Sequence, residues 1–188
     1  MSYYQKMVAA PHVVIDQHEH FIKQTYRNRC LIAAPDGVQA LTVPIVRNDP
    51  SHTAMRDIQI SPHGNWQHLH WHAFVTAYDG SPYFEYYADD FRPFYERPFK
   101  FLLDFNEGLR LLLCELLDIQ PSVQLSEAYQ SGSGTSDFRS SLTPKQPDPD
   151  FLPRRYYQVF AQRNGFLPNL SVVDLLFNMG PESVLWLR

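Results

Sequence analysis

Two arginines near the N-terminus could bind an anionic group. Arg27 and Arg29 stand two residues apart in a stretch that predicts a strand, so both side chains would lie on one strand face. Two guanidinium groups on one face form a fork suited to phosphate or carboxylate, and the pyrophosphate of a sugar nucleotide fits such a fork. The alternative is a structural role, in which either arginine forms a salt bridge with Asp16, Glu19 or Asp57.

Asn28 and Cys30 would lie on the opposite face of the same predicted strand. We expect Asn28 to contact the substrate beside the arginines, or to hydrogen-bond a neighbouring strand or turn. Nearby cations can lower the pKa of a cysteine and create a thiolate nucleophile, which His70 could assist. Because Cys30 would face away from the arginines, we favour a buried structural cysteine.

Three histidines lie in residues 65–72, a stretch that predicts a helix. His68 and His72 are four residues apart, so they share a helix face and could hold one metal ion. No glutamate stands between them and a third ligand would have to come from residues 16–20, so we expect neither a metal nor a cofactor. His70 projects from the opposite side and is a candidate general base. The alternative is a core histidine bonded to a backbone carbonyl.

A carboxylate near the start of the chain is the second catalytic candidate. Asp16 ends the apolar run 12–15, which predicts a short buried strand. Ligands of α/β folds bind at the ends of such strands. We therefore expect Asp16 to lie near the reacting group together with His70.

A second carboxylate lies close to the other end of the chain. Asp174 is part of the apolar run 171–177, which predicts a helix, and a buried carboxylate needs a partner. Arg27 or Arg29 could be that partner, and Asn178 would share the helix face of Asp174. We therefore expect both residues to belong to the substrate site.

The elements that must position these groups alternate between short apolar strands and amphipathic helices. Helices are predicted for residues 2–10, 66–78, about 97–118 and 171–177, and strands for 12–16, 25–33, 38–46, 57–60 and 123–126. This alternation predicts an α/β domain with a mixed sheet covered by helices. Residues 130–153 are rich in Ser, Gly and Pro and are expected to be a flexible linker inside a single domain of residues 1–188.

Composition excludes several classes of protein. The chain has 188 residues, 44% of them hydrophobic, and a formal net charge of −4, which argues against general nucleic-acid binding. Two cysteines are too few for a disulfide framework. There is no signal-peptide pattern and no apolar run of membrane-spanning length, so we expect a cytoplasmic protein without membrane insertion.

Several motifs resemble the WbqC-like family of bacterial proteins. The motifs are Tyr26-Arg27-Asn28-Arg29, Asn65-Trp66, His70-Trp71, Ala77-Tyr78, Ser81-Pro82-Tyr83-Phe84 and Asp174-Leu175-Leu176-Phe177-Asn178 with Gly180. Proteins of this family are found among polysaccharide and O-antigen biosynthesis genes. Members usually begin with a further strand and carry an insert before the last motif, so this chain is expected to be a short form.

The resemblance implies a protein of cell-surface polysaccharide biosynthesis. Combined with the arginine pair, it predicts an anionic, nucleotide-linked sugar as the small-molecule partner and a transferase as the reaction class. The alternative is a noncatalytic binding or scaffold protein derived from an enzyme, which the short form favours. The substrate, the reaction and the oligomeric state are not predicted.

Overall fold

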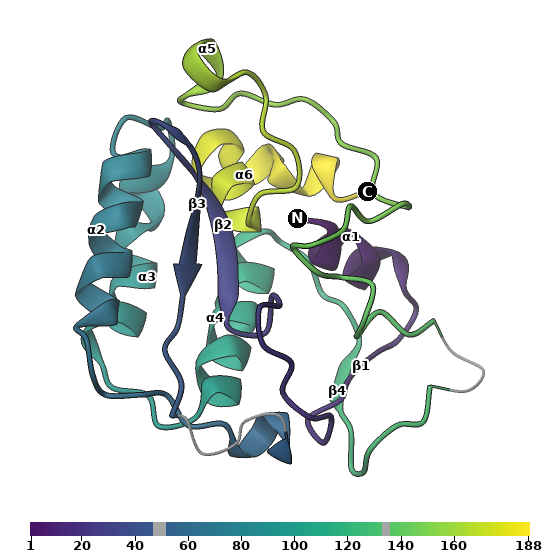
Figure 1. Ribbon diagram of the computed structural model, residues 1–188. Coiled ribbons are helices and arrows are strands. Elements are labelled where there is room, and N and C mark those ends of the chain that lie inside the picture. Colours follow the sequence, from purple (N-terminus) through teal and green to yellow (C-terminus); the bar gives the residue numbers. More distant parts are fainter. Residues whose placement is uncertain (47–51, 133–135) are drawn as a thin grey trace.

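The computed structural model describes residues 1–46, 52–132 and 136–188 (Figure 1). Its α-helices are α1 (Ser2–Ala9), α2 (Trp66–Tyr78), α3 (Phe84–Glu96), α4 (Leu102–Leu116), α5 (Ala161–Asn164) and α6 (Val172–Met179). The 3-10 segments η2 (Met55–Asp57) and η3 (Gly180–Trp186) accompany them. Helices mixed with short strands confirm the predicted α/β class.

Within the described ranges, the strands form two separate two-stranded sheets. β2 (Arg29–Ala34) pairs antiparallel with β3 (Gly37–Thr42), with Arg29 opposite Thr42 and Ala34 opposite Gly37. β1 (Val13–Ile15) pairs parallel with β4 (Val123–Leu125). Parallel and antiparallel pairing thus both occur, but in two sheets and not in one mixed sheet.

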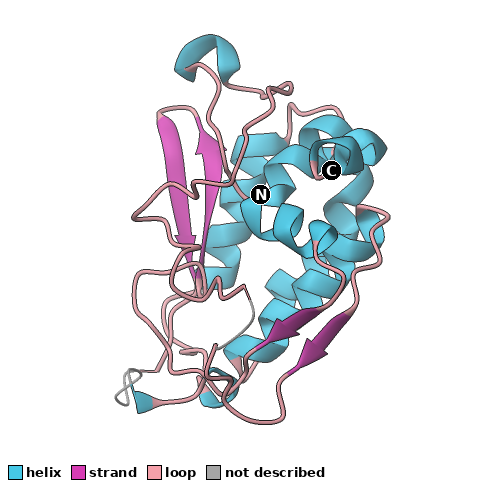
Figure 2. Ribbon diagram, turned by 90° about the vertical axis from the view of Figure 1, so that its right-hand side faces the viewer, coloured by secondary structure: helices cyan, strands magenta, loops and turns pink. Residues whose placement is uncertain are grey.

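The β2–β3 hairpin covers one side of the helices, and the β1–β4 pair lies apart from it (Figure 2). Helix α6 lies at the centre of the larger core, since Leu175, Leu176 and Phe177 are at most 1% exposed. The Phe177 ring contacts aromatic rings from α2 and α3, namely those of Phe74, Tyr78, Phe84 and Phe91. Such edge-to-face contacts add to the stabilisation from buried area.

A smaller core lies between η2, the start of α2 and α4. Its buried members include Phe21, Met55, Ile58, Trp66 and Phe105. The Trp66 and Phe105 rings meet edge to face, with centroids 5.4 Å apart. This core fixes the loop that leads into β2.

The predicted helices at 2–10, 66–78 and 171–177 are confirmed by α1, α2 and α6. The helix predicted at about 97–118 is confirmed by α4, but its predicted start is wrong, because α4 begins at Leu102. Helix α3 was not predicted, because its stretch is dense in aromatic and acidic residues and holds Pro93. The predicted strand 57–60 is wrong at its start, where η2 ends at Asp57; Gln59 and Ile60 form isolated bridges. None of the helices in the described ranges has the length and apolar character needed to cross a membrane.

Residues 133–135 of the predicted linker 130–153 lie outside the described part of the chain. The rest of the segment has no helix or strand but makes long-range contacts. Lys6 pairs with Asp148 at 3.2 Å, and the Arg139 side chain reaches Asp16. The flexibility of this segment stays a prediction.

Candidate functional site

A surface groove of about 610 Å³ lies where the chain enters β2. It is lined by Phe21, Lys23, Gln24, Asn28, Arg29, Thr42, Val43, Pro44 and Ile45. Two of the sequence-predicted residues, Asn28 and Arg29, are in this lining. The groove is the candidate functional site.

The loop before β2 is held by local bonds and by one buried aromatic ring. Phe21 is 2% exposed and anchors the loop in the smaller core. The Thr25 hydroxyl donates to the Ile22 carbonyl at 2.7 Å and closes a turn. Within that turn Gln24 has a φ of +59°, a conformation that non-glycine residues adopt at an energetic cost.

Asn28 connects this loop to the other wall of the groove. Its side-chain amide donates to the Val43 carbonyl at 2.8 Å, and its own carbonyl accepts from the Val43 amide. These bonds extend the β2–β3 ladder by one further pair. The predicted hydrogen bond to a neighbouring strand or turn is therefore confirmed for Asn28.

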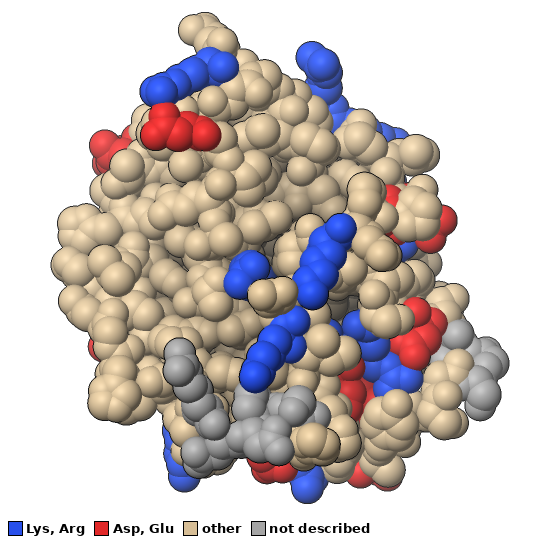
Figure 3. Space-filling model, viewed as in Figure 1, with Lys and Arg blue, Asp and Glu red and all other residues tan. Residues whose placement is uncertain are grey.

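The charged side chains of the groove are both cationic. Arg29 donates through Nε to the Thr42 hydroxyl at 3.0 Å, and Lys23 is exposed. In the ranges that the structure describes, neither side chain pairs with a carboxylate, and the lining holds no Asp or Glu. Figure 3 shows lysine and arginine side chains gathered across the middle of one face. An anion entering the groove would meet positive charge that carboxylates have not neutralised.

Arg27 does not lie in the groove, and the prediction that it shares a strand face with Arg29 is wrong. β2 begins at Arg29, and Arg27 lies in the preceding turn. Its guanidinium holds the Glu19 carboxylate through two bonds, of 2.8 and 2.5 Å, and also donates to the Arg139 carbonyl. The Arg27 side chain is only 10% exposed. Arg27 therefore forms the structural salt bridge that the sequence allowed as the alternative to anion binding.

Asp16 is part of the same buried ionic network. Its carboxylate accepts from Arg139 at 2.5 Å, from the Ser126 hydroxyl and from the backbone amides of His18 and Gln130. Burial would raise the pKa of Asp16, but these bonds together hold it below its ordinary value. Asp16 is therefore an ionised, fully bonded carboxylate outside the groove lining.

His70 projects from α2 to the Thr42 carbonyl at the end of β3 and is not part of the groove lining. It is 8% exposed and packs against the Trp66 ring, with centroids 5.1 Å apart. Burial lowers the pKa of His70 from 6.5 to about 4, which a hydrogen bond to the Thr42 carbonyl partly offsets. The geometry matches the alternative reading, a neutral core histidine bonded to a backbone carbonyl. Thr42 thus contacts His70 through its carbonyl and Arg29 through its hydroxyl.

This buried histidine predicts a loss of stability in acid. The pKa is lower in the folded chain than in the unfolded chain, so the stabilisation is complete above pH 6.5 and is lost as the pH falls toward 4. We expect the contribution of His70 to the free energy of unfolding to fall by about 3 kcal/mol between pH 7 and pH 4.

Urea unfolding of the native chain and of His70→Gln at both pH values measures this contribution. The loss on acidification should be smaller in His70→Gln by about that amount. The matched control is His63→Gln, at an exposed histidine, which should keep the native pH dependence. Equal losses in His70→Gln and the native chain would contradict the prediction.

Asp174 and Asn178 are in the core and not in the groove. The Asp174 carboxylate is 0% exposed and accepts from the hydroxyls of Tyr78 and Tyr156, at 2.8 and 2.6 Å, and from Gln158 at 3.0 Å. The prediction that an arginine pairs with Asp174 is therefore wrong. Asn178 is 3% exposed and donates to the Asp174 carbonyl. These two residues hold α6 against its neighbours.

The other residues singled out from the sequence are also placed. Burial raises the pKa of Cys30 to about 12, so its thiol is not activated for nucleophilic attack. His68 and His72 are exposed on α2. No group of three or more His, Cys, Asp or Glu side chains suited to a metal ion occurs within residues 1–46, 52–132 and 136–188.

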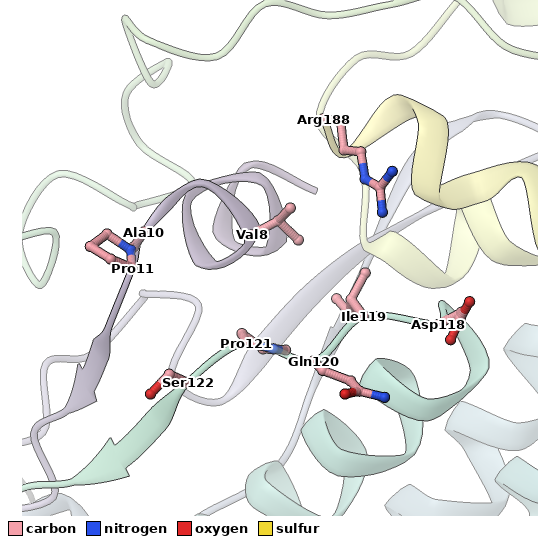
Figure 4. Close-up of a pocket in the computed structure, with 9 residues that line it drawn as sticks. All are labelled: Val8, Ala10, Pro11, Asp118, Ile119, Gln120, Pro121, Ser122 and Arg188. Atoms are coloured by element: carbon pink, nitrogen blue, oxygen red, sulfur yellow. The ribbon is translucent and has the colours of Figure 1, made fainter.

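A second, smaller hollow lies between the end of α1, the segment after α4 and Arg188 (Figure 4). Its volume is about 280 Å³, and its lining includes Pro11, Asp118 and Ile119. Figure 4 shows the Arg188 guanidinium reaching toward Ile119. One cation and one carboxylate balance each other in this lining. It contains none of the sequence-predicted site residues, so the larger groove remains the candidate site.

Sequence reasoning missed Lys23 and Thr42. Lys23 is a lone lysine in a polar loop, and only the structure shows that it lines the same groove as Arg29. Thr42 could have been found as the residue opposite Arg29, had the hairpin register been counted back from the turn at 35–36. Arg139, which binds Asp16, carried no signal within the Ser/Gly/Pro-rich segment.

The fold and the groove define a small α/β protein with a basic surface site. The WbqC-like protein family matches residues 1–146, and the chain belongs to this family. The Asp174–Asn178 motif lies beyond the matched region.

A protein of Mycobacterium tuberculosis (strain ATCC 25618 / H37Rv), named Uncharacterized protein Rv1507c, is similar along the whole chain. It is 25% identical over 213 aligned positions, which cover 100% of this chain and 92% of the mycobacterial protein. No solved structure matches this chain.

Proposed function

We propose that this chain binds an anionic, nucleotide-linked sugar in the groove at Lys23 and Arg29, as a transferase of cell-surface polysaccharide biosynthesis. The observation that carries the proposal is the pair of cations in a groove without carboxylates. Membership of the WbqC-like family supports the biosynthetic context, because its members are found among O-antigen and polysaccharide genes.

The groove has the size and the polar groups for such a ligand. Small-molecule sites commonly have volumes of about 300–1,000 Å³, and about 610 Å³ falls within that range. Arg29 can bind a phosphate through two parallel bonds, whereas Lys23 supplies a point charge. Pro44 and Ile45, which are partly exposed, provide apolar surface beside these charges.

Binding can be tested with a panel of UDP-, GDP-, CMP- and dTDP-linked sugars by isothermal titration calorimetry. We expect at least one of them to bind, and Arg29→Ala to weaken binding about tenfold or more, because a charge-assisted hydrogen bond contributes about 1.5–3 kcal/mol. Lys23→Ala should act in the same direction and reduce the salt dependence.

Two variants outside the groove are the matched controls. Arg188→Ala removes the cation of the smaller hollow, and Lys100→Ala removes an exposed lysine; both should bind as the native chain does. The proposal is wrong if no member of the panel binds, or if Arg188→Ala weakens binding while Arg29→Ala does not.

A noncatalytic binding protein is the second candidate. The observation that favours it is that His70, Asp16 and Cys30 are all buried or bonded within the protein. The catalytic roles predicted for His70 and Asp16 would require their present bonds to open when the substrate binds. Binding without release of the nucleotide, in the presence of candidate acceptors, would favour this second candidate.

A further inference from the structure

Two histidines on the exposed face of α2 lie beside each other. His68 and His72 are one helical turn apart, and their ring centroids are separated by 4.4 Å. The same helix buries Trp66, His70 and Phe74 on its other side. The packing of α2 therefore fixes the direction in which His68 and His72 project, which is toward solvent.

Both imidazoles are available to a ligand. In the described part of the chain, neither His68 nor His72 has a hydrogen bond or an ion pair, and the two rings contact each other. The rings meet edge to face at 71°, so rotation about their own side-chain bonds can turn a nitrogen of each toward a common point. Since both residues are exposed, that rotation displaces only solvent.

We infer that His68 and His72 form a chelating site for one divalent transition-metal ion on the surface of α2. Neutral imidazole binds Cu²⁺, Ni²⁺ and Zn²⁺, and Cu²⁺ binds most tightly in the usual order. Water completes the coordination, because no third His, Cys, Asp or Glu joins the pair in the described ranges. The site is therefore an open two-ligand chelate and differs from a closed structural zinc site.

The helical backbone of α2 brings the two histidine side chains close enough to bind one metal ion. Side chains four residues apart lie over one another only when the backbone is helical, so the unfolded chain presents the same two histidines without this alignment. Metal binding must then stabilise the folded chain. The groove at Lys23 and Arg29 plays no part in this site, and either proposal can fail without the other.

The experiment uses the full chain without an affinity tag. Calorimetric titration with CuCl2 or NiCl2 should show one equivalent bound, and copper spectra should show two nitrogen ligands. At a free metal concentration of about 100 times Kd, Tm should rise by roughly 5 °C or more. Either His68→Ala or His72→Ala should weaken binding roughly tenfold or more, since each leaves a single ligand.

His63→Ala is the matched control, because His63 is an exposed histidine in the loop before α2. It should bind metal as the native chain does. The inference is overturned if the native chain binds no metal, or if His68→Ala and His72→Ala both bind as tightly as the native chain. The circular dichroism of each variant shows whether α2 is intact, so a folding defect cannot be mistaken for the loss of a ligand.

Discussion

Replacing Asp174 with alanine is expected to lower the free energy of unfolding by about 4 kcal/mol or more, because three buried donors then lose their acceptor. Tyr78, Tyr156 and Gln158 all donate to this carboxylate. Each unpartnered buried donor costs about 1–3 kcal/mol, and a cavity adds to the loss. The substitution would therefore remove much of the stability of an ordinary domain.

The effect is large because Asp174 connects four parts of the fold. The carboxylate lies on α6, Tyr78 ends α2, and Tyr156 and Gln158 come from the segment before α5. The Tyr78 hydroxyl also accepts from the Ala33 amide of β2 at 3.3 Å. Burial raises the pKa of Asp174, which the three hydrogen bonds partly offset. Loss of the carboxylate thus loosens contacts well beyond α6.

Urea unfolding at neutral pH measures the change. Asp174→Asn keeps the side-chain volume and one acceptor oxygen, so its loss should be smaller than that of Asp174→Ala. Asp90→Ala, at an exposed aspartate of α3, is the control and should change stability by less than about 0.5 kcal/mol. A loss below about 1 kcal/mol for Asp174→Ala would mean that the buried hydrogen bonds do not hold the fold together.

Replacing Gly180 with alanine is expected to cost about 4 kcal/mol, the sum of backbone strain and steric overlap. Gly180 has a φ of +55° and ends α6. A Cβ there would lie 2.5 Å from two atoms of the Tyr83 ring. The Tyr83 amide donates to the Phe177 carbonyl at 3.0 Å, which holds the backbone of Tyr83 against α6. To make room, the Tyr83 ring would have to turn about its own side-chain bonds.

A second glycine separates the two causes. Gly165 has a φ of +69°, but a Cβ there would meet nothing within 4 Å. Its ψ of −172° places it in a region that glycine alone adopts readily. Gly165→Ala should therefore show the backbone strain alone, about 1–3 kcal/mol. The excess measured for Gly180→Ala by urea unfolding is the overlap with Tyr83. Equal losses at the two glycines would show that Tyr83 moves aside without cost.

Local signals in the sequence predicted the helices well. Residues 66–78 combine a helical spacing of apolar side chains with a stop at 79–82, and α2 has the same bounds. The turn at 35–37 likewise placed the hairpin of β2 and β3. Helix α3 was not predicted, because proline usually breaks a helix. In the structure Pro93 lies in the last turn of α3, four residues before Arg97.

The charged residues show what the sequence could not supply. Both arginines have the same type and almost the same position, yet Arg27 holds Glu19 and Arg29 faces the groove. The difference depends on where β2 begins, and strand boundaries are weakly determined by local patterns. Asp174 was correctly predicted to need a partner, but tyrosine hydroxyls from distant segments fill that role. Which partner each charged residue has depends on tertiary packing.

The parallel pair of β1 and β4 has a consequence for the order in which the molecule is built. His12 and Ser122, which flank this pair and bond to each other, are 110 positions apart in the chain. During synthesis β1 is made well before β4, so β1 has no partner strand until β4 has also been synthesised. Contacts of such long sequence separation form slowly, because a large loop has to close first. β1 therefore completes its pairing late, and it is an unpaired strand until β4 has been made.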